Sequence, residues 1–114
     1  MKRGTIVLTK FPFSDLKFSK RRPAVVISRT QSSRKDIIVT FISSMIPEDL
    51  SDTDLIFTST NKDFKKSELK RTSVIKLDKL ATLNQSIFTG ELGHVSAGIL
   101  KEIDERLKLA LDLK

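Results

Sequence analysis

The stretch KRRPAVVIS, at residues 20–28, contains the clearest strand signal in the chain. Residues 23–28 form a short apolar run that is bounded by polar residues, which predicts a buried strand. Pro23 disfavours helical backbone at the residue before it, so we expect Arg22 to be held extended at the entrance of this strand.

Strand patterns also occur on both sides of this run. Residues 5–11 are rich in β-branched and apolar side chains, and Pro12 limits their continuation. Together with the run at 23–28, we expect strands at residues 5–11, 36–44, 55–60 and 72–77. The segment 61–71 is so rich in charge that we expect an unburied loop there.

The last third of the chain changes to the periodicity of a helix. Ser96 stands where an N-cap would lie, with Val95 and Leu100 placed as a hydrophobic staple. Apolar residues then form one stripe of an amphipathic helix: Ile99, Leu100, Ile103, Leu107, Ala110 and Leu111. Several short strands followed by one helix predict a curled antiparallel sheet, or small barrel, with the helix packed across an opening.

The composition is typical of one soluble globular domain, which we place at residues 1–114. No apolar run approaches the roughly 20 residues of a membrane-spanning helix, and the first residues lack a secretory signal, so we expect a cytoplasmic protein without a membrane partner. The chain has no cysteine and a single histidine, His94. This composition argues against disulfides, thiolate nucleophiles and multi-histidine metal centres, and we expect no metal and no cofactor.

Positive charge is concentrated in the first third of the chain. Residues 1–35 contain ten basic residues and one acid, Asp15, whereas the remainder contains 11 basic and 13 acidic residues. Such an asymmetry favours a polyanionic partner, because each neutralised phosphate releases counterions. A basic surface that only keeps the protein soluble is the alternative.

Several local motifs occur in a fixed order across nearly the whole chain: RG at 3–4 with FPF at 11–13, KRRPAVVIS at 20–28, FISS at 41–44, SVIKLDKL at 73–80 and LGHVS at 92–96. This ordered set resembles the MazF/PemK (Kid-like) family of toxin–antitoxin endoribonuclease toxins. The resemblance implies a mainly β (α+β) fold, a small SH3-like antiparallel β-barrel of about five to seven short strands with a C-terminal α-helix. It also implies a type II toxin that cleaves single-stranded RNA without a metal, by way of a 2′,3′-cyclic phosphate.

The resemblance places the catalytic residues at Arg22 and Ser43. A guanidinium offers a fork of donors that matches phosphate oxygens and stays charged near neutral pH. Ser43 follows a nearly all-apolar strand, so its hydroxyl should emerge at the rim of the barrel; many relatives have threonine there. The alternatives are a solvated charge for Arg22 and a serine that satisfies a turn for Ser43.

Lys76 and Asp78 are further candidates for catalysis or RNA binding. Some relatives use an arginine and an aspartate at these positions, but lysine cannot reproduce a bidentate fork. Residues two apart on a strand face the same side, so a structural ion pair is the alternative. The same motifs imply RNA contacts from Phe13, Lys20, Arg21, Pro23 and Ser44.

The chemistry implied for this site uses the ribose 2′-hydroxyl of RNA, which attacks the adjacent phosphorus once it loses its proton. Arg22 would stabilise the developing charge and Ser43 would position the phosphate. The base stays open, because arginine is almost wholly protonated. We expect a structural or incidental role for His94 rather than acid–base catalysis. A basic cluster could extend the RNA track or form a solvated loop: Lys62, Lys65, Lys66, Lys70 and Arg71.

The resemblance also implies partners and a moving part. It implies a homodimer with an RNA groove shared by two subunits, and a cognate antitoxin whose acidic tail blocks that groove and with which DNA is bound. The polar loop 14–21 is expected to be a flexible gate. Two other functions stay open: a non-catalytic nucleic-acid-binding barrel that acts as a regulator or is a decayed family member, and a gyrase-poison-like toxin.

Overall fold

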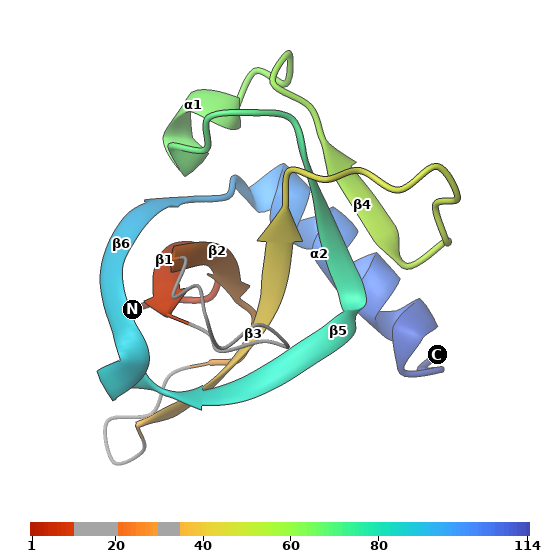
Figure 1. The fold of residues 1–114 in the computed structure, drawn as a ribbon. Helices are drawn as coiled ribbons and strands as arrows, with labels where there is room; N and C mark the ends of the chain where they lie inside the picture. The colour runs from red at the N-terminus through yellow and green to blue at the C-terminus, as the bar shows by residue number, and fades with distance from the viewer. Residues whose placement is uncertain (11–20, 30–34) are drawn as a thin grey trace.

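The computed structural model describes residues 1–10, 21–29 and 35–114. Strands dominate the first 94 residues and one long helix ends the chain (Figure 1). The elements are β1 (Thr5–Lys10), β2 (Arg21–Val26), β3 (Asp36–Ser43), β4 (Asp54–Phe57), α1 (Phe64–Ser67), β5 (Ser73–Asn84), the 3-10 helix η1 (Gln85–Ile87), β6 (Phe88–His94) and α2 (Ala97–Ala110).

The six strands form one antiparallel sheet in the order β4-β5-β3-β2-β1-β6. The sheet is strongly curled, as the sequence predicted, and α2 lies beside it (Figure 1). Within the described residues no strand pairing joins β4 to β6, so the expected closure into a barrel is wrong. Helices pack against the strands that a closed barrel would pair with each other: α2 contacts β4 and β5, and α1 contacts β6.

Two apolar clusters hold this sheet together, one on each face. The first lies against α2 and includes Ile6, Val25, Ile42, Leu55, Phe57, Ile75, Leu77, Ile99 and Ile103. The second includes Val7, Ala24, Val26, Ile37, Val39 and Leu83. Alternate residues of β1 and β2 enter different clusters, so both strands are buried on both faces. This burial explains why β2 is a continuous apolar run rather than an alternating one.

Helix α2 begins where the sequence predicted. Ser96 is its N-cap, and the Oγ of Ser96 accepts a hydrogen bond from the backbone N–H of Ile99 at 3.3 Å. The apolar stripe is shorter than expected, because α2 ends at Ala110 and Leu111 is 53% exposed. None of the helices in the described part of the chain is long and apolar enough to span a membrane.

Gly4 connects β1 to the region around α2. Its φ of +92° lies in the left-handed region, where a Cβ would be strained, and its N–H donates to the carbonyl of Val26. The carbonyl of Gly4 accepts from the N–H of Val95. The neighbouring Arg3 forms an ion pair with Asp104 of α2 and donates to the carbonyl of Ile27. The Arg3-Gly4 motif therefore ties the start of the sheet to the terminal helix.

Segment 61–71 is not the unburied loop that its charge suggested. It contains α1, and Phe64 is buried against Phe57, with ring centroids 5.1 Å apart in an edge-on arrangement. Ser67 is fully buried, and its hydroxyl donates to the carbonyl of Phe64. One aromatic and one small side chain are enough to anchor the charged segment, because the lysines between them stay on the exposed side.

The strand limits also differ from the expectations. β2 begins at Arg21 and ends at Val26, β4 is shorter than residues 55–60 suggested, and β5 extends beyond residue 77 to Asn84. β6 was not expected, because Gly90 and Gly93 interrupt its pattern and none of its side chains is fully buried. Among the described strands, β6 is an edge strand that pairs only with β1, and its sequence lacks a buried apolar face.

Candidate active site

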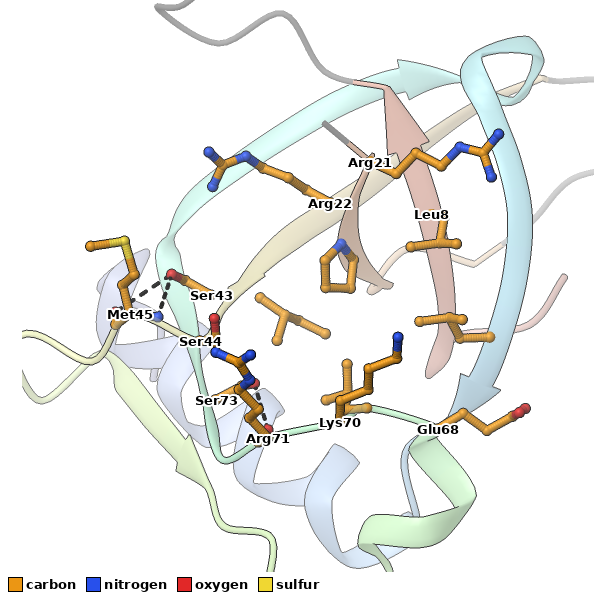
Figure 2. Close-up of a pocket in the computed structure, with 14 residues that line it drawn as sticks. Leu8, Arg21, Arg22, Ser43, Ser44, Met45, Glu68, Lys70, Arg71 and Ser73 are labelled. Atoms are coloured by element: carbon orange, nitrogen blue, oxygen red, sulfur yellow. Dashed lines mark hydrogen bonds between the residues drawn. The ribbon is translucent and has the colours of Figure 1, made fainter. Parts of the chain in front are cut away.

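A groove of about 550 Å³ opens between the ends of β2 and β3 and the segment that follows α1 (Figure 2). Its apolar lining consists of Leu8, Pro23, Ile42, Met45, Leu69 and Leu92. Its polar and charged lining consists of Arg21, Arg22, Ser43, Ser44, Glu68, Lys70, Arg71 and Ser73. The groove thus combines an apolar surface with four cationic side chains and one carboxylate among its described lining residues.

Arg21 and Arg22 enter the groove from the first two positions of β2. The backbone of Arg22 is extended and pairs with Thr9 of β1, which confirms the conformation expected before Pro23. Both side chains are exposed. Figure 2 shows that they diverge, with the guanidinium of Arg22 on the side of Ser43 and that of Arg21 on the opposite side.

Ser43 is the last residue of β3 and is partly buried. Its Oγ accepts a hydrogen bond from the N–H of Met45 at 3.1 Å, so the side chain stabilises the turn after the strand. The hydroxyl also lies 3.5 Å from the carbonyl of Met45, the outer limit for a hydrogen bond. The hydroxyl hydrogen of Ser43 therefore makes at most a weak bond within the protein. Ser43 can donate it to a ligand in the groove while its Oγ still accepts from the N–H of Met45.

The register of the sheet explains why Arg22 and Ser43 meet. Ala24 of β2 pairs with Phe41 of β3 in an antiparallel ladder. Arg22 lies two residues before Ala24 and Ser43 lies two residues after Phe41, so both follow the same end of this ladder and both line the groove. Two residues far apart in sequence are thus brought to one end of one groove.

The other wall of the groove comes from residues 68–71, which follow α1 directly. Figure 2 shows the amine of Lys70 pointing into the groove, with Arg71 close to Ser44 and Ser73 along the side. No hydrogen bond or ion pair joins the side chain of Lys70 or Arg71 to another side chain in the described ranges. The backbone carbonyl of Arg71 accepts from the hydroxyl of Ser73 at 2.9 Å.

The structure brings five of the nine residues that the resemblance assigned to catalysis or RNA binding to this groove: Arg21, Arg22, Pro23, Ser43 and Ser44. Phe13, Lys20 and all but Arg21 of the gate expected at residues 14–21 lie outside the described residues, and Arg21 begins β2. Exposed His94 ends β6, where it pairs with Thr5, and is not part of the groove lining.

Lys76 and Asp78 do not line the groove. Ile42 pairs with Ile75 but Thr40 pairs with Leu80, so residues 76–79 form an irregular bulge in β5. The hydroxyl of Thr40 donates to the carbonyl of Lys76 inside this bulge. Lys76 is partly buried, Asp78 is exposed, and the described residues show no ion pair between them.

Lys70 and Arg71 are the site residues that the sequence left undecided. Of the five basic residues in that cluster, these two line the groove, whereas Lys62, Lys65 and Lys66 do not. Phe64 was the available signal, because a lone aromatic residue in a charged stretch indicates a buried anchor. No cluster of three or more histidine, cysteine, aspartate or glutamate side chains that could hold a metal occurs in the described ranges.

Comparisons with known proteins agree with this fold. A family model described as PemK-like, MazF-like toxin of type II toxin-antitoxin system matches residues 2–111. A search of curated protein sequences found no match.

Solved structures with the same fold include toxins and toxin complexes. An endoribonuclease in complex with its cognate antitoxin from Mycobacterial species has a TM-score of 0.78 and 16% identity, over 100% of this chain and 97% of that chain. The MazE-MazF complex (Form-II) from Deinococcus radiodurans has a TM-score of 0.76 and 16% identity, over 100% and 97%. Mycobacterium tuberculosis toxin MazF-mt6 has a TM-score of 0.73 and 18% identity, over 98% and 99%. At these identities the likeness establishes the fold alone.

Proposed function

This chain belongs to the PemK-like, MazF-like toxins of type II toxin-antitoxin systems, and on that basis we propose that it is an endoribonuclease whose active site is the groove between β2, β3 and residues 68–71. The observation that carries the proposal is the meeting of Arg22 and Ser43 at one end of a cationic groove. A guanidinium and a hydroxyl that line one groove are suited to hold a phosphodiester. Solved structures with this fold that are named endoribonucleases support the same activity.

The proposed reaction uses the 2′-hydroxyl of the substrate as the nucleophile. This oxygen loses its proton to a base and bonds to the adjacent phosphorus, and the bond from phosphorus to the 5′-oxygen breaks as that oxygen gains a proton. The products are a 2′,3′-cyclic phosphate and a free 5′-hydroxyl. Arg22 stabilises the charge that develops on the phosphorane, which is where preorganised donors lower a barrier most. Ser43 donates its hydroxyl hydrogen to a non-bridging oxygen.

No step of this route needs a metal ion, and we propose that cleavage is metal-independent. The residue that acts as the base is not assigned. Lys76 and Asp78 are secondary candidates for proton transfer or RNA contact, although they lie in the bulge of β5 rather than in the groove lining. Asp78→Asn in the cleavage assay tests this secondary role directly.

The substrate we propose is single-stranded RNA, because the groove is lined by cations that bind phosphates and by apolar side chains that accept unpaired bases. Arg21, Pro23 and Ser44 would contact the strand near Arg22, and Phe13 and Lys20 would extend this contact.

The proposal includes a cognate antitoxin that covers the same cations, a homodimer and a cytoplasmic location. Structures of this fold that are described as complexes of a toxin with its antitoxin support the first of these partners.

A long unstructured RNA incubated with the protein in excess chelator tests the proposal. We expect site-selective cleavage, and we expect Arg22→Ala to abolish it. The matched control is Arg29→Ala, which removes the same charge from an exposed arginine outside the groove lining and should leave cleavage intact.

Two outcomes would point to the other functions. RNA binding without cleavage, with Arg22→Ala changing affinity alone, would indicate a non-catalytic regulator. Binding to a topoisomerase with no cleavage of RNA would indicate a gyrase poison.

A further inference from the structure

The groove wall opposite β2 presents two cations, Lys70 and Arg71, that the proposed cleavage step does not use. We infer that they form a second phosphate-binding subsite, which holds a neighbouring phosphate of the same RNA strand while Arg22 holds the scissile one. This inference rests on the proposed function, because it names how the same groove binds its substrate.

The segment that carries these cations is anchored to the rest of the protein by packing and hydrogen bonds. Phe64 is 8% exposed and packs on Phe57, and the buried hydroxyl of Ser67 bonds to the carbonyl of Phe64 and to the N–H of Leu69. The backbone of α1 also rests against β6 at Gly93, where a Cβ would lie 2.1 Å from the carbonyl oxygen of Lys66. Lys70 and Arg71 therefore project from a fixed position, so a ligand does not have to order this backbone.

The charges in the groove favour an anion between its walls. Arg21 and Arg22 face the groove from one side and Lys70 and Arg71 from the other, and neither Lys70 nor Arg71 has a neutralising partner in the described ranges. Like charges that line one hollow repel each other and concentrate polyanions. Glu68, the one carboxylate among the described lining residues, points away from the amine of Lys70 (Figure 2).

The groove lining also includes apolar side chains. Leu8, Pro23 and Leu92 offer a surface for a ribose or an unstacked base, and a free phosphate would leave that surface unused. A strand with at least two phosphates fills both walls and this apolar surface. The subsite should therefore matter for oligonucleotides and not for a dinucleotide, which has a single phosphate for Arg22.

The test uses the double variant Lys70→Gln/Arg71→Gln in the full-length protein. Its matched control is Lys62→Gln/Lys65→Gln, which removes two positive charges from the same segment outside the groove lining. The probes are an oligoribonucleotide with one mapped cleavage site and the same oligonucleotide with 2′-deoxyribose at that site. Far-UV circular dichroism checks that each variant folds.

We expect the groove variant to bind the uncleavable oligonucleotide about tenfold or more weakly, because charge-assisted hydrogen bonds to a phosphate are removed. The slope of log K against log salt should become shallower by about 0.7 for each phosphate that the variant no longer neutralises. Single-turnover cleavage of the all-ribose oligonucleotide at subsaturating concentration should fall in proportion to the loss of affinity. Lys70→Arg/Arg71→Lys, which keeps both charges, should restore most of the affinity.

Equal weakening in the groove and control variants would overturn the subsite, because it would show an effect of net charge alone. Unchanged affinity in the groove variant would overturn it as well. Failure of the proposed function is a separate result: the wild-type protein would then leave the all-ribose oligonucleotide intact, whatever the variants bind.

Discussion

Arg22 projects from the exposed start of β2, whereas Ser43 is tied into a turn at the end of β3. Pro23 made the extended backbone of Arg22 predictable, because the effect of proline on the preceding residue is local. The turn bond of Ser43 was one of two interpretations open from the sequence, and the structure shows that it forms. The cations Lys70 and Arg71 could not be assigned, since their position depends on distant packing at Phe57 and Gly93.

Arg22→Lys keeps the positive charge of the site but removes the planar fork. We expect single-turnover cleavage to fall about 100-fold or more, because a preorganised donor to the developing charge is removed. The affinity for an uncleavable oligonucleotide should change little. Rapid-quench kinetics with the binding measurement separates the two effects, and full activity of Arg22→Lys would show that charge alone suffices.

Ser43→Ala removes both the proposed phosphate donor and the acceptor for the N–H of Met45. We expect the free energy of unfolding to drop by about 0.5–1.5 kcal/mol, the usual value of one hydrogen bond, together with a loss of cleavage. Ser43→Thr keeps the hydroxyl and should retain both. Urea unfolding and single-turnover cleavage measure these effects, and an active Ser43→Ala protein would remove Ser43 from the mechanism.

Elements with local signals were predicted well. Strand β2 is signalled by a proline and an apolar run, and helix α2 is signalled by an N-cap serine. Both elements lie close to their expected positions. β6 and α1 were missed because each depends on the other: the charged α1 segment is seated where Gly93 removes a side chain from β6. The bulge that carries Lys76 and Asp78 arises from the pairing of β5 with β3, which no local pattern reports.

Gly93→Ala should displace α1, because the added Cβ would clash with the backbone carbonyl of Lys66. We expect a destabilisation of about 1–3 kcal/mol, typical of overpacking, and weaker RNA binding through the displaced wall. Gly90→Ala is the matched control in the same strand, since nothing lies within 4 Å of its Cβ. Thermal unfolding of both variants checks this, and equal stability would show that α1 is not seated on Gly93.

Ser96→Ala should weaken the start of α2 by removing the cap on the N–H of Ile99. The expected loss is about 1 kcal/mol, and Ser96→Asp should preserve most of the stability because aspartate is an equally good N-cap. Denaturant unfolding compares the three proteins. Identical midpoints for wild type and Ser96→Ala would mean that the cap contributes nothing.

At the scale of the whole molecule, the groove gathers charge that the linear sequence separates. Its arginines at 21 and 22 come from the strongly basic first 35 residues, whereas Lys70 and Arg71 come from the remainder, which has more acids than bases. Counting charged residues along the sequence therefore predicted a polyanionic partner. It pointed to the two arginines of the groove but not to Lys70 and Arg71 on the other wall. The curled antiparallel sheet with its terminal helix was predictable from periodicity, and its open edge was not.

The identity of the product ends tests the central claim most directly. An oligoribonucleotide with one mapped site is cleaved in excess chelator, and the fragments are weighed by mass spectrometry. We expect a 2′,3′-cyclic phosphate on one fragment, a 5′-hydroxyl on the other, and no cleavage when that site carries 2′-deoxyribose. A 3′-hydroxyl with a 5′-phosphate, or cleavage of the deoxy-substituted strand, would contradict the chemistry assigned to Arg22 and Ser43.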